Sequence, residues 1–248
     1  MNHRPMTLEI QAYPIGPAVQ RSREGYERKY GSSPVDMGGW YRDDDWHRIS
    51  VVIDSLASGS VLDVCAGAGQ FINAVAHTGR LRPLHAIDVG RFNKFHDQTG
   101  RIGYEIMPAT SMRFDDSSFD NVTCLEVLEH VPNDAVHRIV RELRRVCGGK
   151  LIVTVPYCES RPWAEGHVRQ FNRASLDALF PDGKLTVMSF RGARWALVEV
   201  DHGEIPSEVA ARRREAAAHH RWLRAKGSRV MRRCSSLLRR WTLRRTIP

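Results

Sequence analysis

The sequence of 248 residues contains no apolar run long enough to span a membrane. Its longest apolar stretches, such as residues 151–155, have the length of a buried strand. Near the N-terminus there is no continuous apolar segment of the signal-peptide kind. The five cysteines are scattered without a C-x-x-C pair, which argues against a disulfide framework and a zinc knuckle. We therefore expect a reduced, cytoplasmic protein.

Excess positive charge is confined to the C-terminal end of the chain. The net charge of the whole chain is +9, yet residues 205–248 carry 12 arginines and one lysine against two glutamates, a net +11. The first 204 residues therefore carry a net charge of −2. An anionic partner would have to be sought at the tail, because the body has no excess of positive charge.

Short apolar strands alternate with amphipathic helices between residues 61 and 200. Gly148 and Gly149 are expected to end the helix that starts at Pro132. Two further helices are expected at 19–30 and 41–56, after a loosely ordered arm at 1–17. The expected strands are 61–65, 84–89, 102–107, 119–125, 151–155, 184–190 and 195–200, and the expected helices among them are 69–78, 91–98, 132–146 and 172–180.

This alternation predicts a mostly parallel, seven-stranded α/β sheet with helices on both faces. The short link between the last two strands predicts a hairpin, and hence an antiparallel strand. We divide the chain into an N-terminal arm and helix (1–40), an α/β domain (41–204) and a basic helical tail (205–248). In such sheets the ligand lies beyond the carboxyl ends of the strands. Asp63, Asp88 and Glu126 stand at expected strand ends and should converge there.

The stretch "DVCAGAGQF", residues 63–71, joins the first strand of the α/β domain to the next helix. Dinucleotide-binding turns use three glycines, in G-x-G-x-x-G, to bring the backbone close to a pyrophosphate. Here only Gly67 and Gly69 are present, and a carboxylate, Asp63, precedes the turn. A negative charge suits an amino-bearing ligand better than a phosphate, and Asp88 is placed to bind both hydroxyls of a ribose. A ribose with a positively charged group describes S-adenosylmethionine (SAM).

Several segments, in order, resemble the motifs of class I SAM-dependent methyltransferases, in the type 11-like branch. "VLDVCAGAGQF" resembles the first motif, usually D-x-G-x-G-x-G, and "HAIDVG" resembles the second. "PATSMRFDDSSFDNVTCLEVLEHVPN" is similar to the third and fourth motifs, and "RELRRVCGGKLIVTVPY" to the helix and strand after them. "EGHVRQFNRASLDALF" resembles a segment of members that act on small molecules or sugars. The resemblance, over about residues 45–200, implies a Rossmann-like, doubly wound fold and a SAM cofactor.

The resemblance also implies which residues bind SAM. The glycine turn, with the carboxylate before it, would hold the amino-acid end, and Asp88 would bind the ribose. Residues 110–112 would lie along the adenine, with Met112 packed on its ring, and residues 125 and 126 would pass close to the methyl donor. The full expected cofactor-binding set is Asp63, Cys65, Ala66, Gly67, Gly69, Asp88, Thr110, Ser111, Met112, Leu125 and Glu126.

Two positions depart from the family pattern. Cys65 stands where the family usually has glycine, which weakens binding only if the position needs a positive φ or touches the ligand. Pro108 stands where many members have an acidic residue that bonds the adenine amino group, and the lost contact would cost ~1 kcal/mol. We expect both to weaken SAM binding without abolishing it.

A hydroxyl acceptor must lose its proton to a group near the methyl donor. The candidates for this catalytic role are Glu126, Glu129, His130 and His167. The spacing Glu126-x-x-Glu129-His130 resembles an E-x-x-E-H pattern that, with a later His, holds a divalent metal in some quinone-pathway and small-RNA 3′-end methyltransferases. The segment "EVLEHV" also occurs widely in members without metal. We favour the second interpretation and expect no metal.

The tail, residues 205–248, has no strand signal and is expected to form two helices, 207–226 and one that starts at residue 228. Three interpretations remain open: contact of residues 228–245 with an anionic membrane surface, RNA binding, and a solvated extension that packs on the body or on a second subunit. We favour contact with the inner face of a membrane, and nucleic acid is disfavoured because the body has no basic groove. The second helix would carry an apolar stripe among arginines, formed by Val230, Cys234, Leu237, Leu238 and Trp241.

We expect direct methyl transfer from SAM to an oxygen, less often a nitrogen or carbon, of a small-molecule, glycan or lipid-linked acceptor. The alternatives are an RNA or protein methyltransferase and a non-catalytic module of the same fold, the latter suggested by Cys65 and Pro108. A dehydrogenase is disfavoured by the missing third glycine. The acceptor and a homo-oligomeric state stay open, because acceptor pockets vary freely on one fold.

Overall fold

The computed structural model describes residues 6–31, 42–90 and 94–202. The chain divides into two units, residues 1–204 and 205–248. The expected tail helices and the expected membrane contact at 228–245 lie outside the described residues. Within the described ranges, no helix combines the length and the apolar character that a membrane crossing needs.

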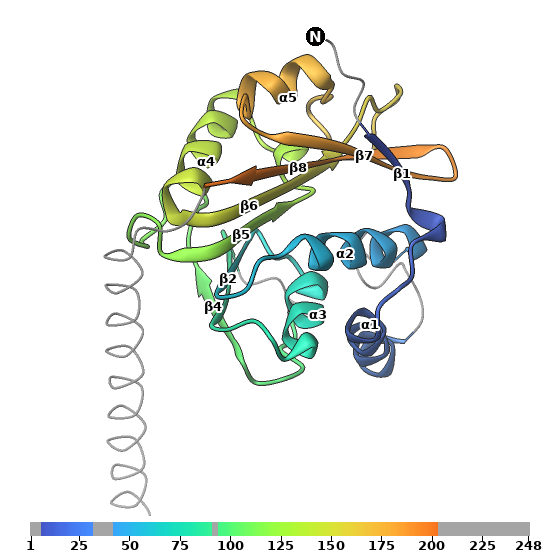
Figure 1. The fold of residues 1–248 in the computed structure, drawn as a ribbon, viewed down its shortest axis with the longest axis vertical. Coiled ribbons are helices and arrows are strands. Elements are labelled where there is room, and N and C mark those ends of the chain that lie inside the picture. Colours follow the sequence, from blue (N-terminus) through green and yellow to red (C-terminus); the bar gives the residue numbers. More distant parts are fainter. Residues whose placement is uncertain (1–5, 32–41, 91–93, 203–248) are drawn as a thin grey trace, which may run out of the picture. The chain divides into compact units, whose positions relative to one another are not determined.

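One eight-stranded sheet forms the centre of the first unit (Figure 1). Its strand order is β1-β7-β8-β6-β5-β2-β3-β4. β8 runs antiparallel to β6 and β7, and every other pair in the described sheet is parallel. The expected mostly parallel α/β sheet with an antiparallel hairpin is confirmed. The strands are Met6–Glu9 (β1), Val61–Val64 (β2), Leu84–Asp88 (β3), Ile102–Ile106 (β4), Phe119–Leu125 (β5), Cys147–Pro156 (β6), Lys184–Phe190 (β7) and Ala193–Asp201 (β8).

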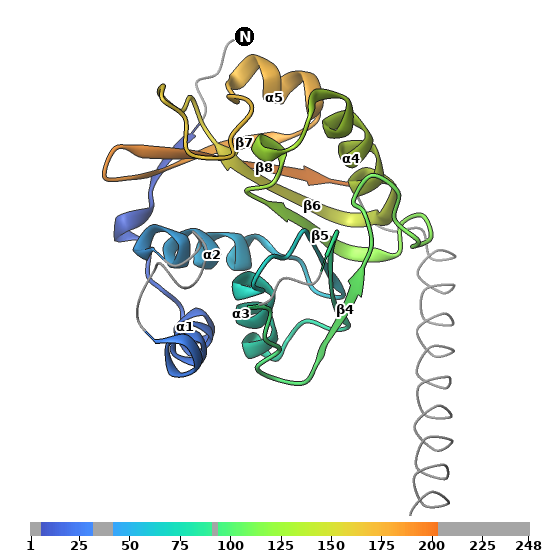
Figure 2. The ribbon, with the colours of Figure 1, turned by 180° about the vertical axis from the view of Figure 1, so that it is seen from behind.

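Helices cover both faces of this sheet, as Figures 1 and 2 show. One face carries α1 (Pro17–Tyr30), α2 (Asp43–Ser55) and α3 (Gln70–Thr78), and the other carries α4 (Asn133–Val146) and α5 (Arg173–Leu179). Two 3-10 turns, η1 (Ile10–Ala12) and η3 (Leu128–His130), connect longer elements. Because successive strand residues point to opposite faces, Val61 packs on the side of α1 to α3 and Leu62 on the side of α4.

The N-terminal arm is part of the sheet, so the expectation of a loosely ordered arm was wrong for its described residues. β1 pairs in parallel with β7, from Met6 opposite Thr186 to Glu9 opposite Ser189. Ile10, which follows β1, is fully buried. Four residues are too few to give a periodic signal, and the partner strand lies at the other end of the domain. The sequence therefore predicts seven strands where the structure has eight.

The short helix expected at 91–98 is not present in its described part, because residues 94–98 form a turn and irregular chain. Asp97 gives the physical reason. Its carboxylate accepts hydrogen bonds from the backbone N–H groups of Thr99 (2.9 Å), Gly100 (2.9 Å) and Ile102 (3.1 Å). A side chain that binds the backbone in this way competes with helix formation.

The glycine pair at 148–149 belongs to β6 and does not end α4 as expected. α4 ends at Val146, and β6 begins directly at Cys147. A Cβ atom on Gly149 would lie 2.4 Å from the backbone oxygen of Asp120 on β5. Glycine is therefore required here by the close approach of two strands rather than by a helix cap.

The turn 65–69, between β2 and α3, passes through the left-handed backbone region at three residues. The φ angles are 60° at Cys65, 53° at Gly67 and 84° at Gly69. Glycine adopts such angles freely, whereas a residue with a Cβ atom pays about 1–2 kcal/mol for them. Cys65, at the position where the family usually has glycine, is therefore strained.

Truncation of Cys65 tests this strain. Cys65→Gly should be more stable than Cys65→Ala by about 1 kcal/mol, because only alanine keeps a Cβ atom at a positive φ. The same two substitutions at Cys124 serve as the control, because Cys124 is buried in β5 and has no positive φ. There the alanine variant should be the more stable by about 0.5–1 kcal/mol, since glycine loses more entropy in a strand. Urea unfolding of the four variants measures both differences, and an alanine advantage at both positions would exclude the strain.

Candidate active site

Asp63 is a buried carboxylate near the carboxyl end of β2. It is 3% exposed and accepts a hydrogen bond from the hydroxyl of Thr123 on β5, 3.0 Å away. Burial raises the pKa of Asp63 to about 7; the Thr123 hydrogen bond opposes this rise, and the nearby charge of Asp88 adds to it. Among the described residues, no cationic side chain forms an ion pair with Asp63. The position therefore favours a ligand that brings a positive charge.

The turn 65–69 is open at Gly67 and closely packed at Gly69. A Cβ atom on Gly67 would meet no atom within 4 Å, whereas one on Gly69 would lie 2.8 Å from the ring of Phe95. Cys65 and Ala66, beside them, are half-buried. Burial raises the pKa of the Cys65 thiol to about 12, which keeps it protonated and unreactive. The turn thus exposes backbone, and no reactive group, to an incoming ligand.

Asp88 ends β3 beside this turn. One of its carboxylate oxygens accepts the N–H of Gly67 at 3.0 Å, and the other accepts the N–H of Val89 at 2.7 Å. Val89 is 71% exposed, and Ile106, the register partner of Asp88 on β4, is 55% exposed. These two apolar side chains offer a surface for a flat ring next to the carboxylate. Sequence reasoning missed both, although the position of Val89 directly after an acidic strand end was a usable signal.

Residues 110–112, which were expected to lie along an adenine, differ in exposure. Thr110 is half-buried and Ser111 is exposed. Met112 is buried in the apolar cluster on the side of α4, and its backbone N–H donates to Glu142 on that helix at 2.7 Å. Packing of Met112 on a bound ring stays a prediction, and Val89 presents more apolar surface to solvent.

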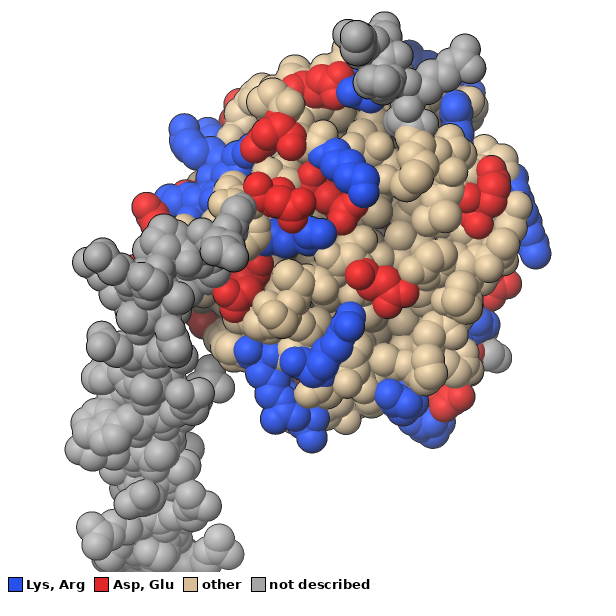
Figure 3. Space-filling view, in the orientation of Figure 1, with Lys and Arg blue, Asp and Glu red and all other residues tan. Residues whose placement is uncertain are grey.

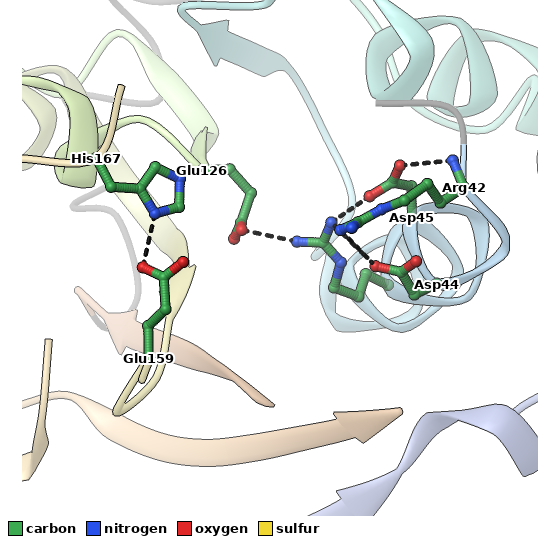
Figure 4. Close-up of polar contacts among 7 residues, drawn as sticks. Arg42, Asp44, Asp45, Glu126, Glu159 and His167 are labelled. Carbon is green, nitrogen blue, oxygen red and sulfur yellow. Dashed lines mark hydrogen bonds and ion pairs between the residues drawn. The ribbon is translucent and has the colours of Figure 1, made fainter. Parts of the chain in front are cut away.

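Glu126, directly after β5, is held by a buried arginine that sequence reasoning did not single out. It has a φ of 55°, and its carboxylate lies 2.9 Å from Nη1 of Arg48 on α2. Arg48 also pairs with Asp45 and packs over the ring of Trp195, with 4.4 Å from the guanidinium carbon to the ring centroid. Burial raises the pKa of Glu126, and the charge of Arg48 opposes that rise. Figure 4 shows the carboxylate of Glu126 turned toward this network of α2.

Glu129, His130 and His167 come together close to the end of β5. One donor atom from each residue lies within 4.8 Å of the other two, and the two imidazole rings meet edge to face with centroids 4.8 Å apart. Glu129 is 1% exposed, and neither of its carboxylate oxygens has a hydrogen-bond partner. Burial raises the pKa of Glu129, and the charge of Glu126 adds to the rise. Three of the four expected catalytic residues thus form one cluster, and Glu126 is paired elsewhere.

Both histidines of this cluster are oriented through Nδ1. Nδ1 of His167 lies 2.7 Å from a carboxylate oxygen of Glu159, and Nδ1 of His130 lies 3.1 Å from the carbonyl oxygen of Gly166. Since both partners only accept, each Nδ1 carries the proton and each Nε2 is left as the basic nitrogen. Figure 4 shows the contact between His167 and Glu159. The cluster can therefore hold a proton or a metal ion through one carboxylate and two imidazole nitrogens.

Residues 62–153 match a family model described as a methyltransferase domain. The ubiquinone biosynthesis O-methyltransferase of Xanthomonas oryzae pv. oryzae is 32% identical over 108 residues, which are 40% of this chain and 44% of that protein. Phosphoethanolamine N-methyltransferase 2 of Caenorhabditis elegans is 26% identical over 141 residues, which are 53% of this chain and 31% of that protein. The chain thus spans less than half the length of these curated relatives.

Among solved structures, the fold is similar to that of 1,6-didemethyltoxoflavin-N1-methyltransferase from Burkholderia thailandensis. The TM-score is 0.50 at 16% identity, over 80% of this chain and 92% of that one. That protein was solved with bound 1,6-didemethyltoxoflavin and S-adenosylhomocysteine (SAH). At this identity the likeness concerns the fold.

The matched segment runs from β2 into β6. It therefore contains the glycine turn, the end of β3 and residues 126–130, and the parallel strand order brings their carboxyl ends to one edge of the sheet. Motif order, fold and matched domain agree with one another. Over residues 62–153 the chain therefore resembles the methyltransferase domain, and its fold is similar to that of a solved methyltransferase.

Proposed function

We propose that the protein transfers the methyl group of SAM to an oxygen of a small-molecule acceptor. The observation that carries the proposal is Asp63, a buried carboxylate without a cationic partner among the described residues, beside the open turn at Gly67. When bound, SAM supplies a methyl group already activated on a sulfonium. Its amino group would provide the counter-charge that Asp63 lacks.

The chain's own residues fit the other parts of the cofactor. The bare backbone at Gly67 permits close approach, and Asp88 at the end of β3 is placed for the two ribose hydroxyls. Val89 and Ile106 would cover one face of the adenine, because they are exposed beside Asp88. The strained Glu126, fixed by Arg48, would keep a negative charge near the sulfonium.

The proton of a hydroxyl acceptor would pass to the cluster of Glu129, His130 and His167. Glu126 is the poorer candidate, because its carboxylate is paired with Arg48 at 2.9 Å. His167 has the arrangement of an oriented base, since Glu159 holds its Nδ1 and leaves Nε2 basic. Proton transfer of this kind contributes about 10²- to 10⁴-fold to a rate.

The relatives support two kinds of acceptor atom. The O-methyltransferase of Xanthomonas oryzae pv. oryzae favours oxygen, which agrees with a cluster able to take up a proton. The N-methyltransferase of Caenorhabditis elegans supports nitrogen as the second candidate. A neutral amine needs no base before it attacks, so the two candidates differ in their dependence on the cluster.

Methyl-labelled SAM tests the reaction. We expect label in an oxygen-linked methyl group of a small molecule when the protein is incubated with fractionated lysate. Glu129→Gln and His167→Ala should lower the label by about 10²-fold or more while SAH binding persists, and His137→Ala, at an exposed histidine of α4, should change nothing. Label in RNA or protein would select those acceptors, and absence of both label and SAH binding would favour a non-catalytic module.

The pH dependence of SAH binding tests the role of Asp63. Below pH 7 the raised pKa leaves Asp63 protonated, so an amino-bearing ligand must displace that proton. Calorimetry should therefore show an affinity that is flat just above pH 7 and falls by up to about tenfold per pH unit below it. Asp63→Asn should bind more weakly and lose the slope, whereas Asp88→Asn should bind more weakly and keep it. An unchanged slope in Asp63→Asn would contradict the assignment.

For the tail we propose contact of residues 228–245 with an anionic lipid surface, which would bring the enzyme to a lipid-linked or glycan acceptor. The support is composition: residues 205–248 hold the excess positive charge, and on the face in Figure 3 the described body mixes acidic and basic side chains. The full chain should sediment with anionic vesicles at low salt and be released at high salt. A chain that ends at residue 204 and binds the vesicles equally well would exclude this role.

A further inference from the structure

A cavity of about 290 Å³ lies between α1, the C-terminal end of α3 and the segment before β4. This volume is near the lower limit of small-molecule sites, which is about 300 Å³. Among the described residues no carboxylate lines the cavity, so it favours an anionic ligand. The lining consists of cations, hydrogen-bond donors and one glycine, namely Gly25, Arg28, Lys29, His77, His96 and Gln98.

The cations at and beside this cavity have few acidic partners. Lys29 forms no ion pair among the described residues, and its ammonium lies 5.5 Å from the centroid of the Tyr30 ring. Lys94 approaches the same ring at 5.4 Å and also lacks an ion pair within the described part of the chain. Arg28 pairs only at 3.9 Å with Glu24, and the two side chains are 72% and 46% exposed. These like charges repel one another, and a bound anion would relieve the repulsion.

Asp97 belongs to the segment 94–98 but does not line the cavity. Its carboxylate already accepts hydrogen bonds from the backbone N–H groups of Thr99, Gly100 and Ile102. Burial raises the pKa of Asp97, and these hydrogen bonds outweigh burial and lower it. Because the backbone satisfies this carboxylate, Asp97 forms no ion pair with the described cations of the cavity.

His96, in the same segment, is a half-buried base close to a lysine. Within the described residues its imidazole has no hydrogen-bond partner. Burial lowers the pKa of His96, the charge of Lys29 lowers it further, and the charge of Asp97 opposes both effects. An anion bound between His96 and Lys29 would raise this pKa, because an opposite charge stabilises the imidazolium. The imidazole of His96 therefore reports on anion binding at this place.

We propose that this cavity binds the phosphate group of a small anionic ligand, with Arg28, Lys29 and His96 as the groups that contact it. Arg28 and Lys29 lie on the face of α1 that also carries Gly25, because residues three and four apart are neighbours on a helix. Hydrogen bonds from such cations to phosphate oxygens are stronger than those between neutral groups. The net charge of −2 for the first 204 residues conceals this local gathering of positive charge.

The segment 94–98 joins the cavity to the glycine turn. The carbonyl oxygen of His96 accepts a hydrogen bond from Nδ2 of Asn73 in α3 at 2.8 Å. A Cβ atom on Gly69 would lie 2.8 Å from the ring of Phe95, the residue before His96. A ligand held by His96 would restrict this segment, so anion binding and SAH binding should favour each other. Anion binding itself is independent of the proposed function, and only this coupling rests on it.

Nuclear magnetic resonance of the histidine rings tests the site in the full chain. The ring signal of His96 is identified by its loss in His96→Gln, so anions bound elsewhere on the chain do not obscure the measurement. Sulfate, which keeps its charge throughout a titration of histidine, should raise the pKa of His96 in a saturable manner. Sodium chloride at equal ionic strength should leave this pKa unchanged or alter it much less.

The Lys29→Ala variant separates the cavity from general screening. Without sulfate it should raise the pKa of His96, because the repulsion by Lys29 is removed. It should also weaken the binding of sulfate and of glycerol 3-phosphate by about tenfold, through loss of a charge-assisted contact. The control is Lys184→Ala, at an exposed lysine of β7, which should stay within about twofold of wild type.

Three outcomes would overturn the proposal or a part of it. An equal response of His96 to sulfate and to chloride, or equal sulfate binding in wild type and Lys29→Ala, would exclude the site. Binding of glycerol 3-phosphate no tighter than that of inorganic phosphate would restrict the ligand to the free ion. SAH that binds but leaves the sulfate affinity unchanged, where about a fivefold gain is expected, would exclude the coupling. A sulfate response in a protein that fails to bind SAH would support the site and count against the proposed function.

Discussion

Charge balance among buried carboxylates governs this site. Asp63, Glu126 and Glu129 lie near the carboxyl ends of β2 and β5, two neighbouring parallel strands. Asp63 and Glu129 are buried, and the side chain of Glu126 is 9% exposed. Within the described residues, only Glu126 has a full ionic partner, and that partner is Arg48. Buried charge without compensation is unfavourable, so the other two carboxylates either hold protons or wait for a cationic ligand. The proposed cofactor binding at Asp63 and the proposed acceptor chemistry at Glu129 both rest on this imbalance.

The fold creates the imbalance by bringing distant segments to one edge of the sheet. β2 and β5 are neighbours, so the hydroxyl of Thr123 reaches the carboxylate of Asp63 although the two residues are 60 positions apart in sequence. α2 supplies Arg48 from before β2, and the loop between β6 and α5 supplies His167 from after β6. A parallel sheet gathers its strand ends on one side, which is why ligands bind there.

The sequence predicted the parts of the site that depend on local order along the chain. The strands β2 to β8 and the glycine turn were predicted because apolar runs and small residues mark them. The condition that the sequence set for Cys65, a positive φ, is met, since φ is 60°; weaker SAM binding stays a prediction. These features are encoded within a few residues of each other.

The remaining features depend on contacts between distant residues. β1 was missed because its four residues pair with a strand near the other end of the domain. Gly149 was wrongly expected to end a helix, because the close approach of the Asp120 carbonyl, which requires glycine there, cannot be read from the local sequence. Arg48 was missed although it interrupts an apolar stripe of α2, because nothing local reveals that Glu126 lies opposite. Glu129 and His167 were predicted as candidate catalytic residues, but their proximity was not predicted. Only the structure shows that neither carboxylate oxygen of Glu129 has a hydrogen-bond partner.

The most direct test of the central claim is a crystal structure of the protein with SAH. The amino group of the ligand should lie within ~3.5 Å of the carboxylate of Asp63, with the ribose hydroxyls on Asp88, because Asp63 needs the counter-charge that the amino group brings. An amino group directed away from Asp63 and bound by another carboxylate, with Asp63 still enclosed and unpaired, would contradict the account.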